Sequence, residues 1–240
     1  MSNAPSLNAS QLLLDLAGTD LSVSYQDRLP SPDVPVLVVS NHRSFMDAFI
    51  LMKALDHPLR VVCHHYMGKT PILKDIVHFL GCYPLESPNK RQKSFLQEAA
   101  NILNSCQWLG IFPEGATPML QLTQPHQVGE FQRGFAHLAL GKNLPNLAVL
   151  PVAIASYKET IVKPFPIRFL HLLDADEPLF DQDGFHEVVL YHHVKVLIGQ
   201  PYWVDDSLRQ QYQGKTAKSV VNQLTRHCHQ EIVNLLQPVW

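Results

Sequence analysis

The sequence predicts an α/β fold with a mostly parallel central sheet flanked by helices, a more antiparallel C-terminal part and a closing C-terminal helix. Three observations predict this fold. Short apolar runs alternate with helical segments through the first two thirds of the chain, which is typical of a parallel sheet covered by helices. Longer strand-like segments follow. The last segment, 215–236, has apolar residues at helical spacing.

The first four expected strands are short, continuous apolar runs, which suit strands buried on both faces. These runs are 34–40, 60–66, 108–112 and 147–155, and longer strands are expected at 168–173 and 187–198. Helices are expected at 45–55, 71–80, 90–105, 130–142 and 215–236. A proline-rich stretch at 29–35 separates the N-terminus from the main body, so we divide the chain into a short N-terminal segment, 1–33, and a single domain, 34–240.

Composition narrows the class of protein. The 240 residues are 46% apolar and 17% charged, as in a globular chain with a sizeable core. The net charge of -2 argues against a nucleic-acid partner. The four cysteines form no C-x-x-C pair, so we expect a reducing compartment, the cytoplasm. We see no signal peptide and no run of about 18 apolar residues, so any membrane contact is expected to be peripheral.

The first chemical motif, at 40–47, follows the first buried strand directly. His42 can serve as a general base because the pKa of an unperturbed histidine lies near neutrality. A carboxylate that holds the imidazole would help it, and Asp47 is five residues further on. On a regular helix this offset is about 140°, so the pair can meet only if His42 lies in the turn and Asp47 in the first helical turn. Alternatively, Ser44 and Asp47 form a capping box.

Two further motifs lie later in the chain, the first of them directly after an expected strand. In the turn at Glu114 and Gly115, backbone N–H groups can face a ligand, Gly115 can take positive φ, and Glu114 can accept from a substrate hydroxyl. The alternative is a surface turn with a solvated glutamate. Arg133, near an expected helix start, could clamp a phosphate through two N–H donors, or it could be a solvated helix charge.

Together these motifs resemble the glycerolipid acyltransferase superfamily, which includes bacterial 1-acylglycerol-3-phosphate acyltransferases. The resemblance runs from about residue 34 to residue 155. The family's N-H-x4-D, F-P-E-G, F-K/R-x-G and V-P-V-A blocks correspond to Asn41, His42 and Asp47, to 112–115, to the close variant Phe131, Arg133 and Gly134, and to 150–153.

The resemblance implies transfer of a fatty acyl group from acyl-CoA or acyl carrier protein to a hydroxyl of lysophosphatidic acid in phospholipid synthesis. His42 and Asp47 would be the catalytic pair. The expected partners are the acyl thioester donor, a lysophospholipid acceptor and a membrane surface. No cofactor beyond the acyl cosubstrate is implied and no metal. The histidine pairs agree with the lack of a metal, since His64 and His65 would face opposite sides of a strand.

Two departures concern the acceptor's phosphate. Ala116, Thr117 and Pro118 follow the Glu-Gly pair where relatives often carry an arginine, and Glu86 stands where a second arginine is common. Substitutes for phosphate binding are Arg133 first, then Lys69 and Arg91. The alternatives are the same chemistry on another lysolipid or hydroxylated lipid, a thioester hydrolase that uses water, and a non-catalytic lipid-binding module.

Overall fold

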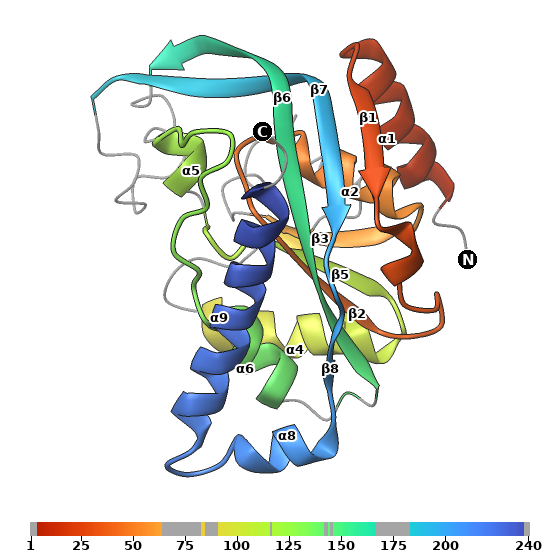
Figure 1. Ribbon diagram of the computed structural model, residues 1–240, viewed down its shortest axis with the longest axis vertical. Helices are drawn as coiled ribbons and strands as arrows, with labels where there is room; N and C mark the ends of the chain where they lie inside the picture. Colours follow the sequence, from red (N-terminus) through yellow and green to blue (C-terminus); the bar gives the residue numbers. More distant parts are fainter. Residues whose placement is uncertain are drawn as a thin grey trace.

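The computed structural model describes residues 4–63, 83–84, 91–115, 117–141, 144, 146–166 and 183–237. Its strands form one eight-stranded sheet in the order β1-β7-β6-β2-β5-β3-β4, with β8 paired to β6 (Figure 1). The strands are β1 (Asp20–Ser24), β2 (Val36–Ser40), β3 (Leu59–Cys63), β4 (Tyr83–Pro84), β5 (Trp108–Ile111), β6 (Leu147–Pro166), β7 (Phe185–Ile198) and β8 (Tyr202–Val204). The α-helices are α1 (Ala4–Leu16), α2 (Asp47–Leu55), α4 (Arg91–Asn104), α5 (Thr117–Leu120), α6 (Gly134–Gly141), α8 (Asp206–Gln211) and α9 (Ala217–Leu236), and η1 (Gln26–Arg28) is a 3-10 turn.

The sheet is mostly parallel, as predicted. Strand β2 pairs in parallel with both β5 and β6, β3 pairs in parallel with β5 and β4, and β1 pairs in parallel with β7. The antiparallel pairs are β6 with β7 and β6 with β8, which form the predicted antiparallel C-terminal part. The carboxyl ends of β2 and β5 therefore lie side by side, and this is where α/β sheets place their ligands.

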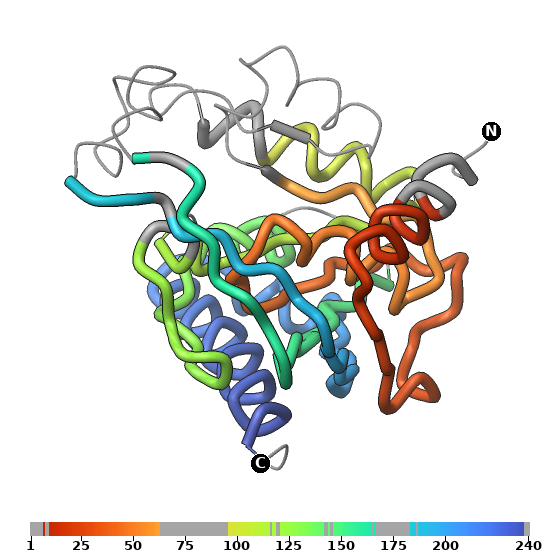
Figure 2. The backbone as a smooth tube through the Cα atoms, turned by 90° about the horizontal axis from the view of Figure 1, so that it is seen from above, coloured from red at the N-terminus to blue at the C-terminus, as the bar shows by residue number. Residues whose placement is uncertain are grey.

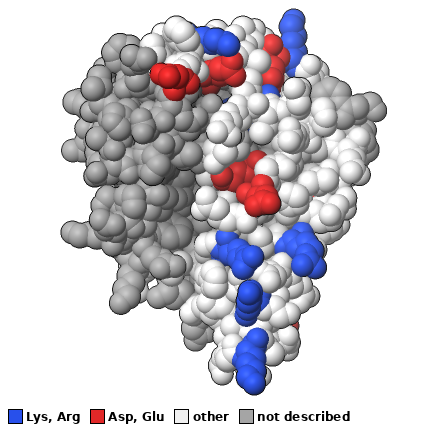
Figure 3. All heavy atoms as spheres, turned by 90° about the vertical axis from the view of Figure 1, so that its left-hand side faces the viewer, with Lys and Arg blue, Asp and Glu red and all other residues white. Residues whose placement is uncertain are grey.

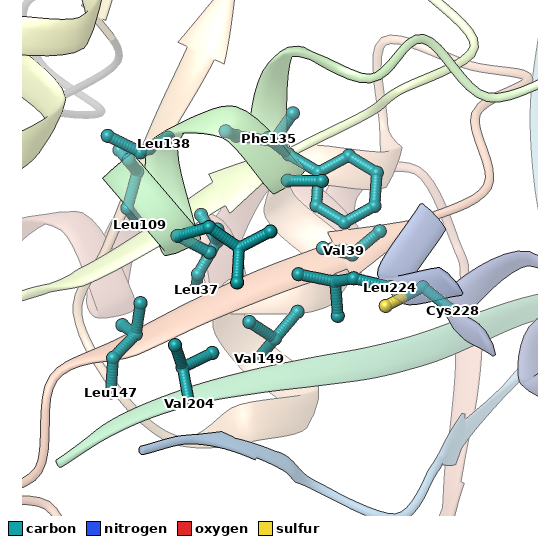
Figure 4. Packing of buried hydrophobic residues seen from close by; sticks show 14 of the residues in the cluster. Leu37, Val39, Leu109, Phe135, Leu138, Leu147, Val149, Val204, Leu224 and Cys228 are labelled. Carbon is teal, nitrogen blue, oxygen red and sulfur yellow. The ribbon is translucent and has the colours of Figure 1, made fainter. Parts of the chain in front are cut away.

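Each face of the sheet has its own apolar core. Within β2, Leu37 and Val39 join a cluster shared with α4, α6 and α9, while Val36 and Val38 join a cluster shared with α1 and α2. This alternation follows from the two-residue period of a strand. Figure 4 shows the first cluster, and Figure 2 shows α9 and α1 on opposite sides of the strands. Helices thus cover both faces, as the sequence predicts.

The closing helix is confirmed, since its predicted apolar positions are all buried: Val221, Leu224, Cys228, Ile232 and Leu235. Helices α2, α6 and α9 begin two or more residues later than predicted. Helix α2 begins at Asp47 because the side chain of that residue binds backbone N–H groups of the preceding turn. Helix α6 begins at Gly134, since the residues before it run as a loop in which Gln132 N–H donates to the carbonyl of Pro113.

Strand β6 is longer than predicted. Beyond Ala155 it continues to Pro166 in antiparallel pairing with β7. The predicted helix 71–80, the predicted strand 168–173 and the end of the predicted strand 60–66 lie outside the described residues.

The N-terminal segment contributes to the same sheet and core. Strand β1 pairs with β7, and Leu14 of α1 is buried in the cluster shared with α2. The division at residue 33 stays a prediction about domain organisation. None of the described helices combines the length and apolar character needed to cross a bilayer.

Candidate active site

The turn that carries His42 is anchored where it leaves β2. The side-chain amide of Asn41 makes two hydrogen bonds with the backbone of Ile154 on β6: Nδ2 donates to the carbonyl at 3.0 Å, and Oδ1 accepts from the N–H at 2.8 Å. Asn41 therefore fixes the first residue of the turn to the centre of the sheet. His42, the next residue, starts from a rigid backbone.

His42 and Asp47 meet as the sequence analysis expects. His42 Nδ1 lies 2.8 Å from Asp47 Oδ2, with the Asp47 side chain fully buried and the His42 side chain 14% exposed. The same oxygen accepts the backbone N–H groups of Arg43 at 2.7 Å and Ser44 at 2.9 Å. A carboxylate oxygen that accepts from two N–H groups is an acceptor for the imidazole too, so the proton of this contact belongs to Nδ1. In the neutral ring, Nε2 then keeps its lone pair.

Only half of the capping-box alternative is formed, since Asp47 Oδ2 accepts Ser44 N–H but Ser44 Oγ does not accept Asp47 N–H. Ser44 Oγ accepts from Met46 N–H at 3.1 Å and donates to the carbonyl of Val189 at 2.7 Å, instead of capping Asp47 N–H. Asp47 is the first residue of α2, and its side chain folds back onto the turn. Asp47 therefore organises the loop that holds the imidazole.

The second motif reaches the first through Phe112 and Glu114. The rings of His42 and Phe112 are stacked, with centroids 4.2 Å apart and an interplanar angle of 14°. Glu114 Oε1 accepts from His42 N–H at 2.9 Å, and Oε2 accepts from Gly129 N–H at 2.5 Å. Burial raises the pKa of Glu114, and the hydrogen bonds from Gly129 and His42 only partly oppose this. Glu114 is thus a buried link that holds the backbone of His42.

The predicted substrate-binding residues have different positions. Glu114 is 5% exposed and directs both oxygens to backbone N–H groups, and its role toward a substrate stays a prediction. Gly115 has a φ of 71°, as expected, and its N–H closes the turn onto the carbonyl of Phe112 at 3.1 Å. Arg133 is exposed directly before α6, and Lys69 lies outside the described residues. Among the described residues, no group of three or more His, Cys, Asp or Glu side chains could hold a metal ion.

A family model described as Acyltransferase matches residues 20–155, more than half of the chain. This chain belongs to the acyltransferase family. It is 28% identical over 149 residues to a probable 1-acyl-sn-glycerol-3-phosphate acyltransferase of Mycoplasma pneumoniae. The matched region covers 60% of this chain and 52% of the relative. It is also 25% identical over 135 residues to the chloroplastic 1-acyl-sn-glycerol-3-phosphate acyltransferase LPAT1 of Arabidopsis thaliana. That matched region covers 56% of this chain and 35% of the relative.

The chain thus spans 52% and 35% of the length of these two curated relatives. Its fold is similar to the crystal structure of the 1-acyl-sn-glycerophosphate (LPA) acyltransferase PlsC from Thermotoga maritima. That comparison has a TM-score of 0.62 and 16% identity, and covers 98% of this chain and 78% of the other. At this identity the likeness shows the fold alone.

The sequence carries no signal for the role of Arg43. Arg43 is 4% exposed, and its guanidinium forms a bidentate pair with Glu159, with contacts of 2.7 and 3.0 Å. Nε and Nη2 also donate to the carbonyl of Thr123. The residue after the candidate base is thereby tied to the distal half of β6. The partner lies 116 residues away, so no local pattern could have identified it.

We expect Glu159→Gln to lower the free energy of unfolding by about 2 kcal/mol near neutral pH, because a charge-assisted pair to a buried arginine is lost. Burial raises the pKa of Glu159, but the side-chain contacts with Arg43 and Ser156 and the charge of Arg43 outweigh it and lower the pKa from its usual 4.5. The folded chain therefore binds fewer protons than the unfolded chain just below pH 4.5, so this stabilisation is present above that pH and is lost as pH falls through the folded pKa. Denaturant unfolding across this range measures it.

Glu187→Gln is the matched control, because Glu187 pairs with the 60% exposed Lys163 on the neighbouring strands. An exposed pair contributes about 0–1 kcal/mol. Equal effects of the two substitutions, or an effect of Glu159→Gln that persists at low pH, would contradict the role given to the Arg43 pair.

We expect Glu114→Gln to lower the acyl-transfer rate about tenfold or more, because both carboxylate oxygens accept N–H groups and an amide can replace only one of them. Its NH₂ group would face the N–H of either His42 or Gly129. Steady-state kinetics on folded protein, checked by circular dichroism, measures the effect. Glu130→Gln removes a neighbouring exposed charge and should retain the rate. A full rate for Glu114→Gln would refute the link.

Proposed function

We propose that this acyltransferase moves a fatty acyl group from an acyl-CoA or acyl-carrier-protein thioester to the hydroxyl of lysophosphatidic acid in phospholipid synthesis. The observation that carries the proposal is the 2.8 Å contact between His42 Nδ1 and Asp47 Oδ2, which leaves Nε2 available to accept a proton. The names of the relatives support the acceptor, since both are called 1-acyl-sn-glycerol-3-phosphate acyltransferases.

The proposed mechanism is direct transfer. The acceptor hydroxyl gives its proton to His42 Nε2 while its oxygen attacks the thioester carbonyl carbon. Asp47 stabilises the imidazolium through the hydrogen bond at Nδ1. The tetrahedral intermediate then expels the thiolate as the C–S bond breaks, and the thiolate takes the proton back from Nε2. The products are the ester and a free thiol, and no acyl-enzyme forms.

A second acceptor class has its own support. Thr117 and Pro118 follow the Glu114 turn where relatives often carry an arginine, which favours an acceptor with another headgroup or without a phosphate. If the acceptor does carry a phosphate, we propose Arg133 as the first residue to bind it. Arg133 is exposed, and the N–H of the preceding residue, Gln132, donates to the carbonyl of Pro113 beside the Glu114 turn.

A panel assay tests the function. Purified protein is incubated with acyl-CoA or acyl carrier protein and with lysophosphatidic acid, lysophosphatidylcholine, monoacylglycerol or no acceptor. We expect phosphatidic acid as the main product, and we expect His42→Ala to reduce its formation by about 10²–10⁴-fold. His193→Ala, at an exposed histidine of β7, is the control and should retain activity.

Each other outcome of the panel has a separate meaning. Preference for an acceptor without phosphate would replace the proposed substrate by the second class. Free fatty acid without any acceptor would indicate a hydrolase. Retained activity in His42→Ala would remove His42 from the mechanism.

We also propose that α1 brings the protein to a membrane surface as a peripheral protein; a cytoplasmic location stays a prediction. Leu12, Leu13 and Leu16 are 59%, 42% and 76% exposed, while Leu14 is buried beneath them. The face in Figure 3 carries acidic as well as basic side chains, so the apolar side chains of α1 are the better candidates for lipid contact.

Flotation with phospholipid vesicles tests this proposal. The wild-type protein is expected to float with the vesicles, and Leu12→Ser with Leu16→Ser is expected to reduce the floated fraction without unfolding the protein, because both side chains are exposed. Wild-type protein that stays in the soluble fraction would contradict it.

A further inference from the structure

A hydrogen bond joins the closing helix to the active-site turn. His229 of α9 lies outside the matched family region, and its Nε2 is 3.1 Å from the carbonyl oxygen of Gly129. Gly129 N–H in turn donates to Glu114 Oε2, and Glu114 Oε1 accepts from His42 N–H. A continuous chain of hydrogen bonds therefore runs from α9 to the backbone of the candidate base.

The α9 end of this chain is rigidly placed. Cys228, the residue before His229, is fully buried with Leu224 and Ile232 in the core that α9 shares with the sheet (Figure 4). The His229 and Phe131 rings also form a T-shaped pair, with centroids 4.9 Å apart and an interplanar angle of 81°. Because the core fixes its helix, His229 can restrain the loop that contains Gly129.

Gly129, in the middle of the hydrogen-bond chain, depends on bonds from both sides. Gly129 has no side chain, and a Cβ atom there would lie 2.8 Å from Glu114 Oε2, so a side chain at this position would displace the carboxylate. A glycine gains the most backbone freedom when it is released. The hydrogen bond that Gly129 N–H donates to Glu114 fixes the peptide group before Gly129, and the bond that its carbonyl accepts from His229 fixes the peptide group after it. Loss of either bond frees the residue.

We propose that His229 is a positioning residue for acyl transfer, acting on His42 through Gly129 and Glu114. This rests on the proposed function only for the kinetic consequence, since the hydrogen-bond chain itself is independent of the substrate. His229 acts here as a donor, because a carbonyl oxygen can only accept. A side chain that donates from the same place should therefore preserve the effect, and an apolar side chain of similar size should abolish it.

The test compares three variants by steady-state kinetics at a temperature below their unfolding transitions. His229→Leu is expected to lower kcat about tenfold, with the KM of donor and acceptor within about twofold, because a small displacement of a catalytic group is costly while binding surfaces are untouched. His229→Gln keeps an N–H donor and is expected to stay within about threefold of the wild type. His227→Leu is the control, since His227 lies on the same helix as His229 but contacts Tyr202 of β8.

Amide hydrogen exchange of His42, followed by NMR, gives a readout that needs no turnover. His229→Leu is expected to speed exchange of the His42 N–H about tenfold, and His229→Gln and His227→Leu are expected to leave it near the wild-type rate. Unchanged exchange or unchanged kcat in His229→Leu overturns the proposal, as does an equal loss in His227→Leu. If the wild-type protein transfers no acyl group but the variants still show the expected differences in His42 N–H exchange, the proposed function is refuted and the hydrogen-bond chain is supported.

Discussion

One buried carboxylate oxygen organises the site. Asp47 Oδ2 holds the backbone N–H groups of Arg43 and Ser44 and also contacts the His42 imidazole. The first two bonds shape the turn between β2 and α2, and the third orients the ring within that turn. Local folding and the orientation of the candidate base therefore depend on the same atom. A change at Asp47 alters both.

The surrounding fold holds this turn from several sides. Asn41 ties it to the centre of β6, Arg43 ties it to the distal half of β6 through Glu159, and Glu114 ties it to the turn after β5. Each tie uses a buried polar group whose partner is a backbone group or an opposite charge, which is how buried polar groups are tolerated. The apolar cores on the two faces of the sheet fix the strands from which these ties extend. The imidazole is thus oriented before any substrate arrives.

Local patterns predicted the elements but only part of the site. The continuous apolar run of β2 and the helical spacing in α9 were sufficient to predict these two elements, because burial imposes these sequence patterns directly. The His42 and Asp47 spacing was not sufficient alone, since His171 and Asp176 repeat it and its outcome depends on the helix start. Arg43 with Glu159, and Gly129 with His229, are pairs 116 and 100 residues apart, so only the assembled sheet brings them together.

The most direct test of the central claim is the tautomer of His42 in the neutral ring. Long-range proton–nitrogen NMR on histidine-labelled protein measures it, with His42→Ala to assign the signals. The geometry predicts a protonated Nδ1 bonded to Asp47 and an unprotonated Nε2 that can accept the proton of a hydroxyl. A neutral ring with its proton on Nε2 would contradict the account, because His42 could not then act as the base at that position.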